Sequence, residues 1–228
     1  MAQKIFLDRK WRFNENFTEE MITKPMEEST LVNIPHTVKE TPLSYFDESI
    51  YQMVSAYQKS IFAPAQWEGK VVLLTFEGVG HSCDVYVNGQ HLKHHDCGYT
   101  AFTVDVSKEL TYGQENLITV KVDSRETLDQ PPFGYVVDYM TYGGIYRDVY
   151  FEIKEQEHFT DVFLQPSLLE RVSTNKRTPK QIRMMQVQGI LKTECMLSDK
   201  VYSLAKGEHV FIKQFLGDEL LISQPVGG

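Results

Sequence analysis

The chain has 228 residues and a mass of 26.4 kDa, with 42% hydrophobic, 24% charged and 12% aromatic residues. This composition is typical of a folded globular protein and excludes a disordered chain, a collagen-like repeat and a coiled coil. The formal net charge of −8 argues against a nucleic-acid partner, because phosphate binding needs a basic surface.

Strand character dominates the chain when its segments are taken in order. Residues 18–28 have only weak helical spacing, which Pro25 interrupts. Residues 83–87 alternate in polarity and lead into Asn88-Gly89, a dipeptide that favours a type I′ hairpin turn. The other predicted strands are 71–76, 100–106, 116–122, 159–165, 182–192 and 210–215, and residues 173–180 are predicted to form a loop. Short strands without long helices between them predict an all-β fold of antiparallel sandwiches.

Charge and aromatic residues divide unevenly at Lys154. Residues 1–154 carry 22 acidic and 14 basic side chains, whereas residues 155–228 carry nine of each. The first part also holds 22 of the 27 aromatic residues. We therefore predict two domains, 1–154 and 155–228, of which the first suits a polar, uncharged ligand.

The sequence favours a cytoplasmic location. Residues 1–13 have charges at positions 4, 9, 10 and 12, so they lack the apolar core of a signal peptide. No run approaches the roughly 20 apolar residues of a membrane-spanning helix, so we expect no membrane partner. Three cysteines at irregular positions form no disulfide framework, which favours a reducing compartment.

A cluster of metal-ligand residue types occurs at His91, His94, His95 and Cys97. On a regular strand His91 and His95 share one face while His94 points to the other, so the three imidazoles do not converge. We therefore favour a solvent-facing second strand of the Asn88-Gly89 hairpin, and we expect neither a metal nor another cofactor.

Nucleophilic and phosphate-binding motifs are absent from the sequence, which has neither a Gly-x-Ser-x-Gly element nor a Walker-type glycine loop. The most unusual stretch is residues 131–147, which packs five aromatic residues, two prolines and three glycines into 17 positions. Two interpretations remain open. The stretch is either a rigid aromatic loop or a carbohydrate site, in which rings stack on a sugar and Asp138 accepts hydrogen bonds from its hydroxyls.

Five segments together resemble the N-terminal sugar-binding domain of the family 2 glycoside hydrolases, which include bacterial β-galactosidases, β-glucuronidases and β-mannosidases. They occur in the family's order over residues 5–153 and are 33–37, 69–79, 85–89, 98–105 and 142–149. Residues 155–228 resemble, more weakly, the opening strands of the immunoglobulin-like domain that follows in this family. The chain departs from the family at Cys97, where a glycine is common, so a positive φ there would be strained.

The resemblance implies a jelly-roll β-sandwich followed by a partial immunoglobulin-like sandwich. In this family a TIM barrel comes next and carries both catalytic glutamates of a retaining glycosidase. We therefore assign no catalytic residue and expect the non-catalytic N-terminal portion of a β-galactosidase-like enzyme, inactive alone. Its expected partners are the barrel and, through the full-length enzyme, a β-linked sugar. Whether the enzyme forms a homo-oligomer stays open.

One substrate-binding residue follows from the resemblance. In β-galactosidases and β-glucuronidases this domain lends the barrel an aspartate that binds sugar hydroxyls, and the matching position is Asp138, six residues before Gly144. Trp11 and Trp67 are predicted to lie in the core. The competing interpretations are a stand-alone carbohydrate-binding module and a sandwich that binds a protein partner.

Overall fold

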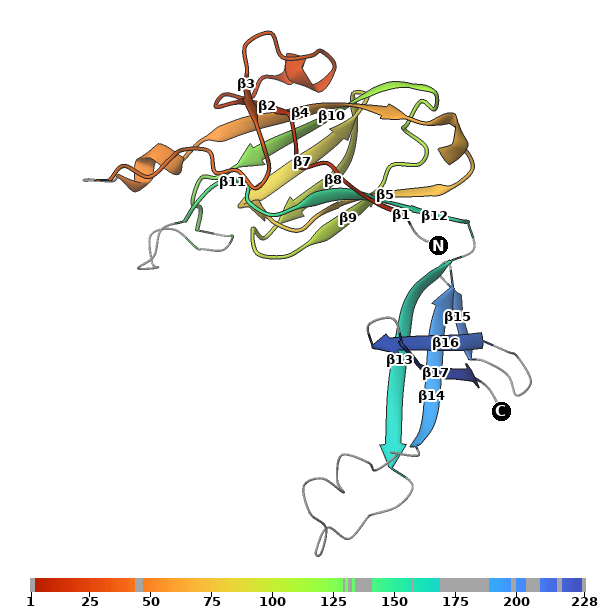
Figure 1. Ribbon diagram of the computed structural model, residues 1–228. Coiled ribbons are helices and arrows are strands. Elements are labelled where there is room, and N and C mark those ends of the chain that lie inside the picture. The colour runs from red at the N-terminus through yellow and green to blue at the C-terminus, as the bar shows by residue number, and fades with distance from the viewer. Residues whose placement is uncertain are drawn as a thin grey trace, which may run out of the picture. The chain divides into compact units, whose positions relative to one another are not determined.

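The computed structural model divides into two compact units, Met1–Gln156 and Glu157–Gly228. It describes residues 3–43, 47–128, 130, 133, 141–156 and 158, and beyond them the backbone of the strands at 159–168, 189–197, 200–203, 210–216 and 219–226. The all-β prediction is confirmed, because the described residues contain no α-helix and form antiparallel sheets (Figure 1).

Two larger antiparallel sheets and a two-stranded sheet of β6 and β11 make up the described part of the first unit (Figure 1). The four-stranded sheet has the order β1-β12-β5-β9, and the six-stranded sheet has the order β3-β2-β4-β10-β7-β8. The strands are β1 (Gln3–Phe6), β2 (Trp11–Asn14), β3 (Thr30–Val32), β4 (Val54–Ala63), β5 (Val71–Phe76), β6 (Val79–Gly80), β7 (Ser82–Val87), β8 (Gln90–Asp96), β9 (Phe102–Asp105), β10 (Gln114–Asp123), β11 (Gly144–Ile145) and β12 (Val149–Lys154). Three 3-10 helices interrupt them: η1 (Glu19–Ile22), η2 (Glu48–Tyr51) and η3 (Ala65–Trp67).

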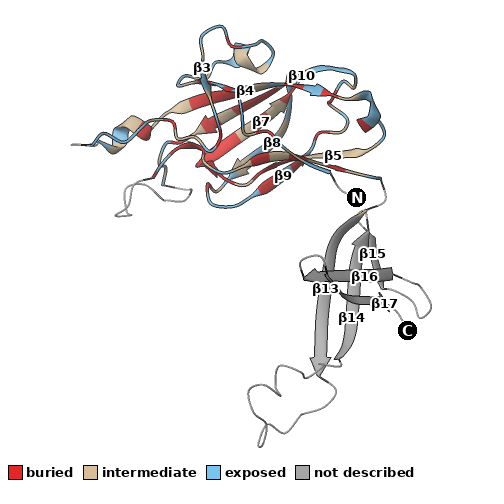
Figure 2. Cartoon of the chain, in the orientation of Figure 1, coloured by how far each residue is buried: buried red, intermediate tan, exposed pale blue. Residues whose placement is uncertain are grey.

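The core of the first unit lies between the two larger sheets, where the inward-facing residues of the central strands are buried (Figure 2). On strand β10, the alternating residues Ile118, Val120 and Val122 belong to this core and are fully buried. The predicted core tryptophans are confirmed: Trp11 has no exposed surface and Trp67 is 6% exposed. Burial of such apolar side chains is the main source of the sandwich's stability.

Strand β4 is central to the six-stranded sheet and was absent from the sequence-based prediction, because Gln58, Lys59 and Ser60 break its apolar pattern. Gln58 is nevertheless fully buried. Its amide nitrogen donates to the carbonyls of Met21 (2.5 Å) and Lys24 (2.8 Å), and its oxygen accepts from the Met26 amide (2.8 Å). Through these hydrogen bonds Gln58 fixes residues 21–26. They lie in the segment 18–28, which was expected to have weak helical spacing and in which only η1 is helical.

In its described residues the second unit contains a three-stranded antiparallel sheet and a two-stranded hairpin. The sheet pairs β13 (Phe159–Leu168), β14 (Gly189–Leu197) and β15 (Lys200–Ser203), and the hairpin joins β16 (Val210–Leu216) to β17 (Glu219–Val226). Of the predicted strand 182–192, residues 182–188 lie outside the described residues, as does the predicted loop 173–180. Two statements stay predictions. One is the division into domains at 1–154 and 155–228, and the other is that the second domain is an incomplete immunoglobulin-like sandwich.

Candidate functional site

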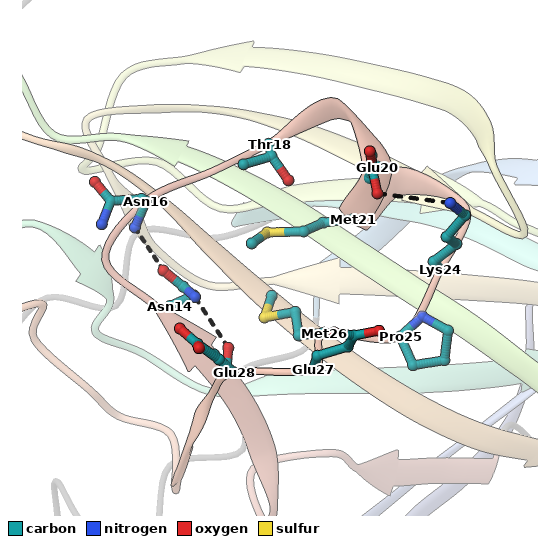
Figure 3. A pocket seen from close by; sticks show the side chains of 10 residues that line it. All are labelled: Asn14, Asn16, Thr18, Glu20, Met21, Lys24, Pro25, Met26, Glu27 and Glu28. Atoms are coloured by element: carbon teal, nitrogen blue, oxygen red, sulfur yellow. Dashed lines mark hydrogen bonds and ion pairs between the residues drawn. The ribbon is translucent and has the colours of Figure 1, made fainter.

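Two hollows stand out on the first unit, and the larger, of about 410 Å³, lies along residues 14–28. Figure 3 shows Met21 and Met26 pointing into it. The Asn14 side chain donates to the Glu28 carbonyl (2.9 Å) and accepts from the Asn16 amide (2.8 Å). Asn14 therefore serves the local structure of this segment.

The second hollow, of about 320 Å³, is walled by aromatic rings and is here named the tyrosine pocket. Its lining residues are Thr37, Gly80, His81, Gly98, Tyr99, Tyr142 and Tyr146. A volume of this size is at the lower end for small-molecule sites, which suits a single ring. The lining residues come from four distant segments, several of which belong to the motifs that carry the family resemblance.

Close backbone packing brings these segments together. Strand β11 pairs with β6, which places Gly144 opposite Gly80. Gly98 packs against the same point, because a Cβ atom there would lie 3.0 Å from the Gly80 Cα. The hydroxyl of Tyr146 also donates to the Gly98 carbonyl. The pocket therefore rests on backbone contacts that larger side chains would prevent.

His81 forms the polar part of the pocket wall. It lies just before β7, and its amide donates to the Asp123 carbonyl at the end of β10 (2.9 Å). The side chain is 2% exposed, and its Nε2 is one of three buried side-chain polar atoms of the described residues that lack a hydrogen-bond partner. Burial lowers the pKa of His81, although the carboxylates of Glu126 and Asp123 oppose this shift. His81 is therefore neutral at pH 7.

Tyr142 and Tyr99 provide exposed ring surface at the pocket. They are 44% and 47% exposed, which is high for tyrosine side chains that line a hollow. Tyr142 packs edge-on against the buried ring of Tyr51, with the centroids 5.4 Å apart. The Tyr51 hydroxyl lies 2.8 Å from the Thr41 hydroxyl, so this support is itself fixed. A ring held from one side and exposed on the other can stack on an apolar ligand face.

The predicted substrate ligand Asp138 lies outside the described residues. Its described neighbour along the chain is Thr141, which precedes Tyr142 of the pocket. The role assigned to Asp138 therefore stays a prediction. Sequence reasoning missed His81, because its unpartnered nitrogen results from burial between distant segments. The available signal was its place two residues after the end of the family motif at 69–79.

The histidine cluster differs from its predicted arrangement. A bulge shifts the register between β7 and β8, since Val85 pairs with Lys93 while Tyr86 pairs with His91. His91 Nε2 and His94 Nδ1 consequently both lie 2.9 Å from Asp84 Oδ1, so the prediction that His91 and His94 occupy opposite faces is wrong. No three His, Cys, Asp or Glu side chains in the described part of the chain are arranged to hold a metal ion.

The backbone at Cys97 confirms the expected departure from the family pattern. This residue has a φ of 107°, a conformation that glycine adopts with far less strain than cysteine. Its carbonyl accepts the Thr100 hydroxyl (3.4 Å), and Thr100 Oγ1 also lies 3.0 Å from His95 Nε2. A non-glycine residue thus occupies a positive-φ position directly before Gly98.

Comparison with known families decides the assignment, because residues 7–154 match the model of the sugar binding domain of the glycosyl hydrolases family 2. The chain belongs to this family. The β-galactosidase of Thermoanaerobacter pseudethanolicus is 37% identical over 203 residues, which are 86% of this chain and 27% of the relative. The β-glucuronidase of Bacteroides fragilis is 30% identical over 154 residues, which are 68% of this chain and 21% of the relative.

Solved structures of family 2 enzymes share the fold. A putative β-galactosidase from Bacteroides fragilis superimposes with a TM-score of 0.62 and 32% identity, covering 73% of this chain and 26% of that protein. A Bifidobacterium dentium β-glucuronidase in complex with coumarin-3-O-glucuronide gives a TM-score of 0.71 at 19% identity, covering 86% of this chain and 36% of that protein. The chain thus spans about a fifth to a third of the length of these relatives. Within its described residues, no helix combines the length and hydropathy needed to cross a bilayer.

Proposed function

We propose that the chain is the N-terminal, non-catalytic portion of a retaining β-glycosidase of the β-galactosidase type. The observation that carries this proposal is the family match over residues 7–154, made by a chain that spans only 27% of the β-galactosidase it resembles at 37% identity. A second β-galactosidase, from Thermoanaerobacterium thermosulfurigenes, is 33% identical over 94% of this chain, whereas the β-glucuronidase match covers 68%. These coverages favour a β-galactoside over a β-glucuronide as the substrate.

In the proposed role the first unit supports a catalytic barrel and completes its sugar pocket. Asp138 accepts hydrogen bonds from sugar hydroxyls, as charged acceptors in sugar sites do. The tyrosine pocket supports this role, because the exposed ring of Tyr142 comes four residues after Asp138 in the chain and lines the same pocket as the exposed ring of Tyr99. The barrel supplies the acid/base and nucleophile carboxylates, about 5 Å apart in retaining enzymes.

Turnover measurements test the proposal. The 228-residue chain is incubated with chromogenic β-galactosides and β-glucuronides, beside the complete enzyme that contains it. We expect hydrolysis by the complete enzyme, with the galactoside preferred, and none by the chain alone. Measurable hydrolysis by the chain would contradict a non-catalytic portion.

A cytoplasmic location belongs to the same proposal and is supported by Cys83 and Cys97, which are both free.

A second candidate function is a stand-alone carbohydrate-binding module. The tyrosine pocket favours it, because residues of the first unit alone form that pocket. This alternative predicts a calorimetric signal when free sugars are added to the isolated chain. The N-terminal portion of an enzyme predicts weak binding or none, since the barrel's half of the sugar pocket is missing.

A further inference from the structure

The walls of the tyrosine pocket are held in place before any ligand binds. The Tyr142 ring packs on Tyr51, and the Tyr146 hydroxyl donates to the Gly98 carbonyl. A Cβ atom on Gly80 would stand 2.9 Å from the Tyr142 carbonyl oxygen, so these two backbones are in direct contact. A site whose walls are already fixed loses little conformational freedom on binding, which favours even a small ligand.

None of the described side chains that line the pocket carries a charge at neutral pH. Three of the seven lining residues are tyrosines, two are glycines, and the others are Thr37 and His81. Burial lowers the pKa of His81, so its imidazole is neutral. The guanidinium of Arg147 lies over the Tyr146 ring, 5.4 Å from its centroid, and is not among the lining groups. An ionised ligand would therefore give up water without gaining a counter-charge from the lining.

Two lining groups can bond to a hydroxyl of a ligand. The Thr37 hydroxyl donates to the Lys39 carbonyl (3.1 Å), and its oxygen can still accept. Of the buried side-chain polar atoms that lack a partner in the described residues, only His81 Nε2 belongs to the pocket wall. A rotation of the imidazole toward a bound ring would give this nitrogen a partner, and such side-chain rotations are common on binding. A sugar hydroxyl suits either tautomer of the neutral imidazole, because it both donates and accepts.

We propose that the tyrosine pocket binds one uncharged sugar ring, which stacks on Tyr99 and Tyr142 and bonds to His81, and that it discriminates against sugars that carry a carboxylate. The exposed rings of the two tyrosines supply the apolar surface, and the volume of about 320 Å³ limits the ligand to a single ring. The choice of a sugar rests on the proposed function, whereas the selection of a neutral ring follows from the lining itself. A β-galactoside meets this condition, and a β-glucuronide does not.

The test is a saturation-transfer NMR experiment on the 228-residue chain at neutral pH, with methyl β-galactoside and methyl β-glucuronide as the two probes. We expect the galactoside to bind with a dissociation constant on the order of millimolar, as is usual for a ligand of about a dozen heavy atoms. The glucuronide should bind about tenfold more weakly, because its carboxylate loses water without gaining a partner. Equal binding of the two probes would overturn the selection of a neutral ring.

Three variants locate the binding in the pocket. Tyr142→Ala removes a stacking ring and should weaken galactoside binding about fivefold, whereas Tyr142→Phe keeps the ring and should stay within about twofold of the wild type. The matched control is Phe62→Ala, because Phe62 on β4 is similarly exposed (55%) and does not line the pocket. A Tyr142→Ala chain that binds like the wild type, or a Phe62→Ala chain that loses as much affinity, would overturn the assignment to this pocket.

His81→Phe separates contact with the ligand from structural support. The change keeps a ring of similar size and removes the unpartnered nitrogen, so the urea midpoint should not fall while galactoside binding weakens about fivefold. A lower midpoint with unchanged binding would assign His81 a structural role and overturn its contact with the sugar. Tryptophan fluorescence confirms that each variant is folded at the temperature of the NMR experiment.

The outcomes for the pocket and for the proposed function can be told apart. If the complete enzyme hydrolyses β-galactosides but the chain shows no saturation transfer to the galactoside, the pocket assignment fails and the proposed function stands. If the chain binds the galactoside selectively while the complete enzyme is inactive, the pocket assignment holds and the proposed function fails.

Discussion

Gly143 lies directly against Ser124: a Cβ atom built at Gly143 would stand 2.2 Å from the Ser124 Cβ and 2.5 Å from its Oγ. Ser124 cannot withdraw easily, because it is fully buried and its hydroxyl bonds to two carbonyls. Gly143 directly precedes β11, and Ser124 directly follows β10 of the six-stranded sheet. The contact therefore holds the strand pair β6–β11, with the neighbouring Tyr142 and Tyr146, against the end of that sheet. The glycine is thus required by close packing and not by turn geometry.

Gly143→Ala should destabilise the first unit by about 1–3 kcal/mol, since the added methyl group overlaps buried atoms. Unfolding in urea followed by tryptophan fluorescence measures this, and both tryptophans of the chain lie in the first unit. Adding Ser124→Gly should cost less in the Gly143→Ala background than in the wild type, because it removes the overlapping Cβ. A Gly143→Ala variant with the wild-type midpoint would contradict the contact.

Cys97→Gly should stabilise the first unit. The substitution relieves a φ of 107°, a conformation that costs an L-residue about 1 kcal/mol. The extra freedom of glycine in the unfolded chain offsets part of the gain. Cys97→Ala serves as the control, because it removes the thiol and keeps the strain. The account is wrong if Cys97→Gly has a lower urea midpoint than Cys97→Ala.

Gln58→Leu should cost about 3 kcal/mol in the free energy of unfolding. The change leaves the Met26 amide and the Lys24 carbonyl without their partner, whereas the Met21 carbonyl keeps its hydrogen bond from the Thr119 hydroxyl (3.0 Å). Each buried unpaired group costs about 1–3 kcal/mol. The matched control is Gln90→Leu on an exposed position of β8, which should stay within about 0.5 kcal/mol of the wild type. Equal effects of the two substitutions would show that Gln58 does not hold the 21–26 segment.

Part of this fold follows from the sequence, because apolar runs and turn dipeptides report local structure. The strand predicted at 71–76 matches β5 in both bounds, and the strand predicted at 83–87 ends before Asn88, whose φ of 50° fits the expected turn. Strand β4 is unpredictable from its own pattern, since the burial of Gln58 depends on three carbonyl and amide groups more than 30 residues away.

The candidate site was predictable only in outline. The family motifs contain Thr37, Gly98-Tyr99 and Tyr142 in the family's order, and these residues do meet at one pocket. Local patterns carry no information on the bulge opposite Val85 or on the buried Nε2 of His81. Both result from how distant strands pair, so periodicity along a single strand gave the wrong faces for His91 and His94.

His94 should titrate above the usual value of about 6.5. Its Nδ1 lies 2.9 Å from Asp84 Oδ1 and its Nε2 lies 2.9 Å from Asp96 Oδ1, and the hydrogen bond to Asp84 is the main cause that raises the pKa of His94. Because the folded pKa is the higher one, the stabilisation is complete below about pH 6.5 and is lost as the pH rises through the folded pKa. The side chain is 51% exposed, so the effect should stay under about 1 kcal/mol.

Proton–carbon NMR titration of the imidazoles checks this prediction. Asp84→Asn should lower the pKa of His94, because the replacement removes the negative charge that favours the imidazolium. A His94 pKa at or below the usual value in the wild-type chain, or one that Asp84→Asn leaves unchanged, would contradict the arrangement.

The central claim, that this chain completes the sugar pocket of a β-glycosidase, is tested most directly by one kinetic comparison. The kcat/KM of the complete enzyme on a chromogenic β-galactoside is measured with Asp138 and with Asp138→Ala. We predict a fall of about tenfold or more, as expected for the loss of a hydrogen bond to a charged group. An unchanged kcat/KM would contradict the claim.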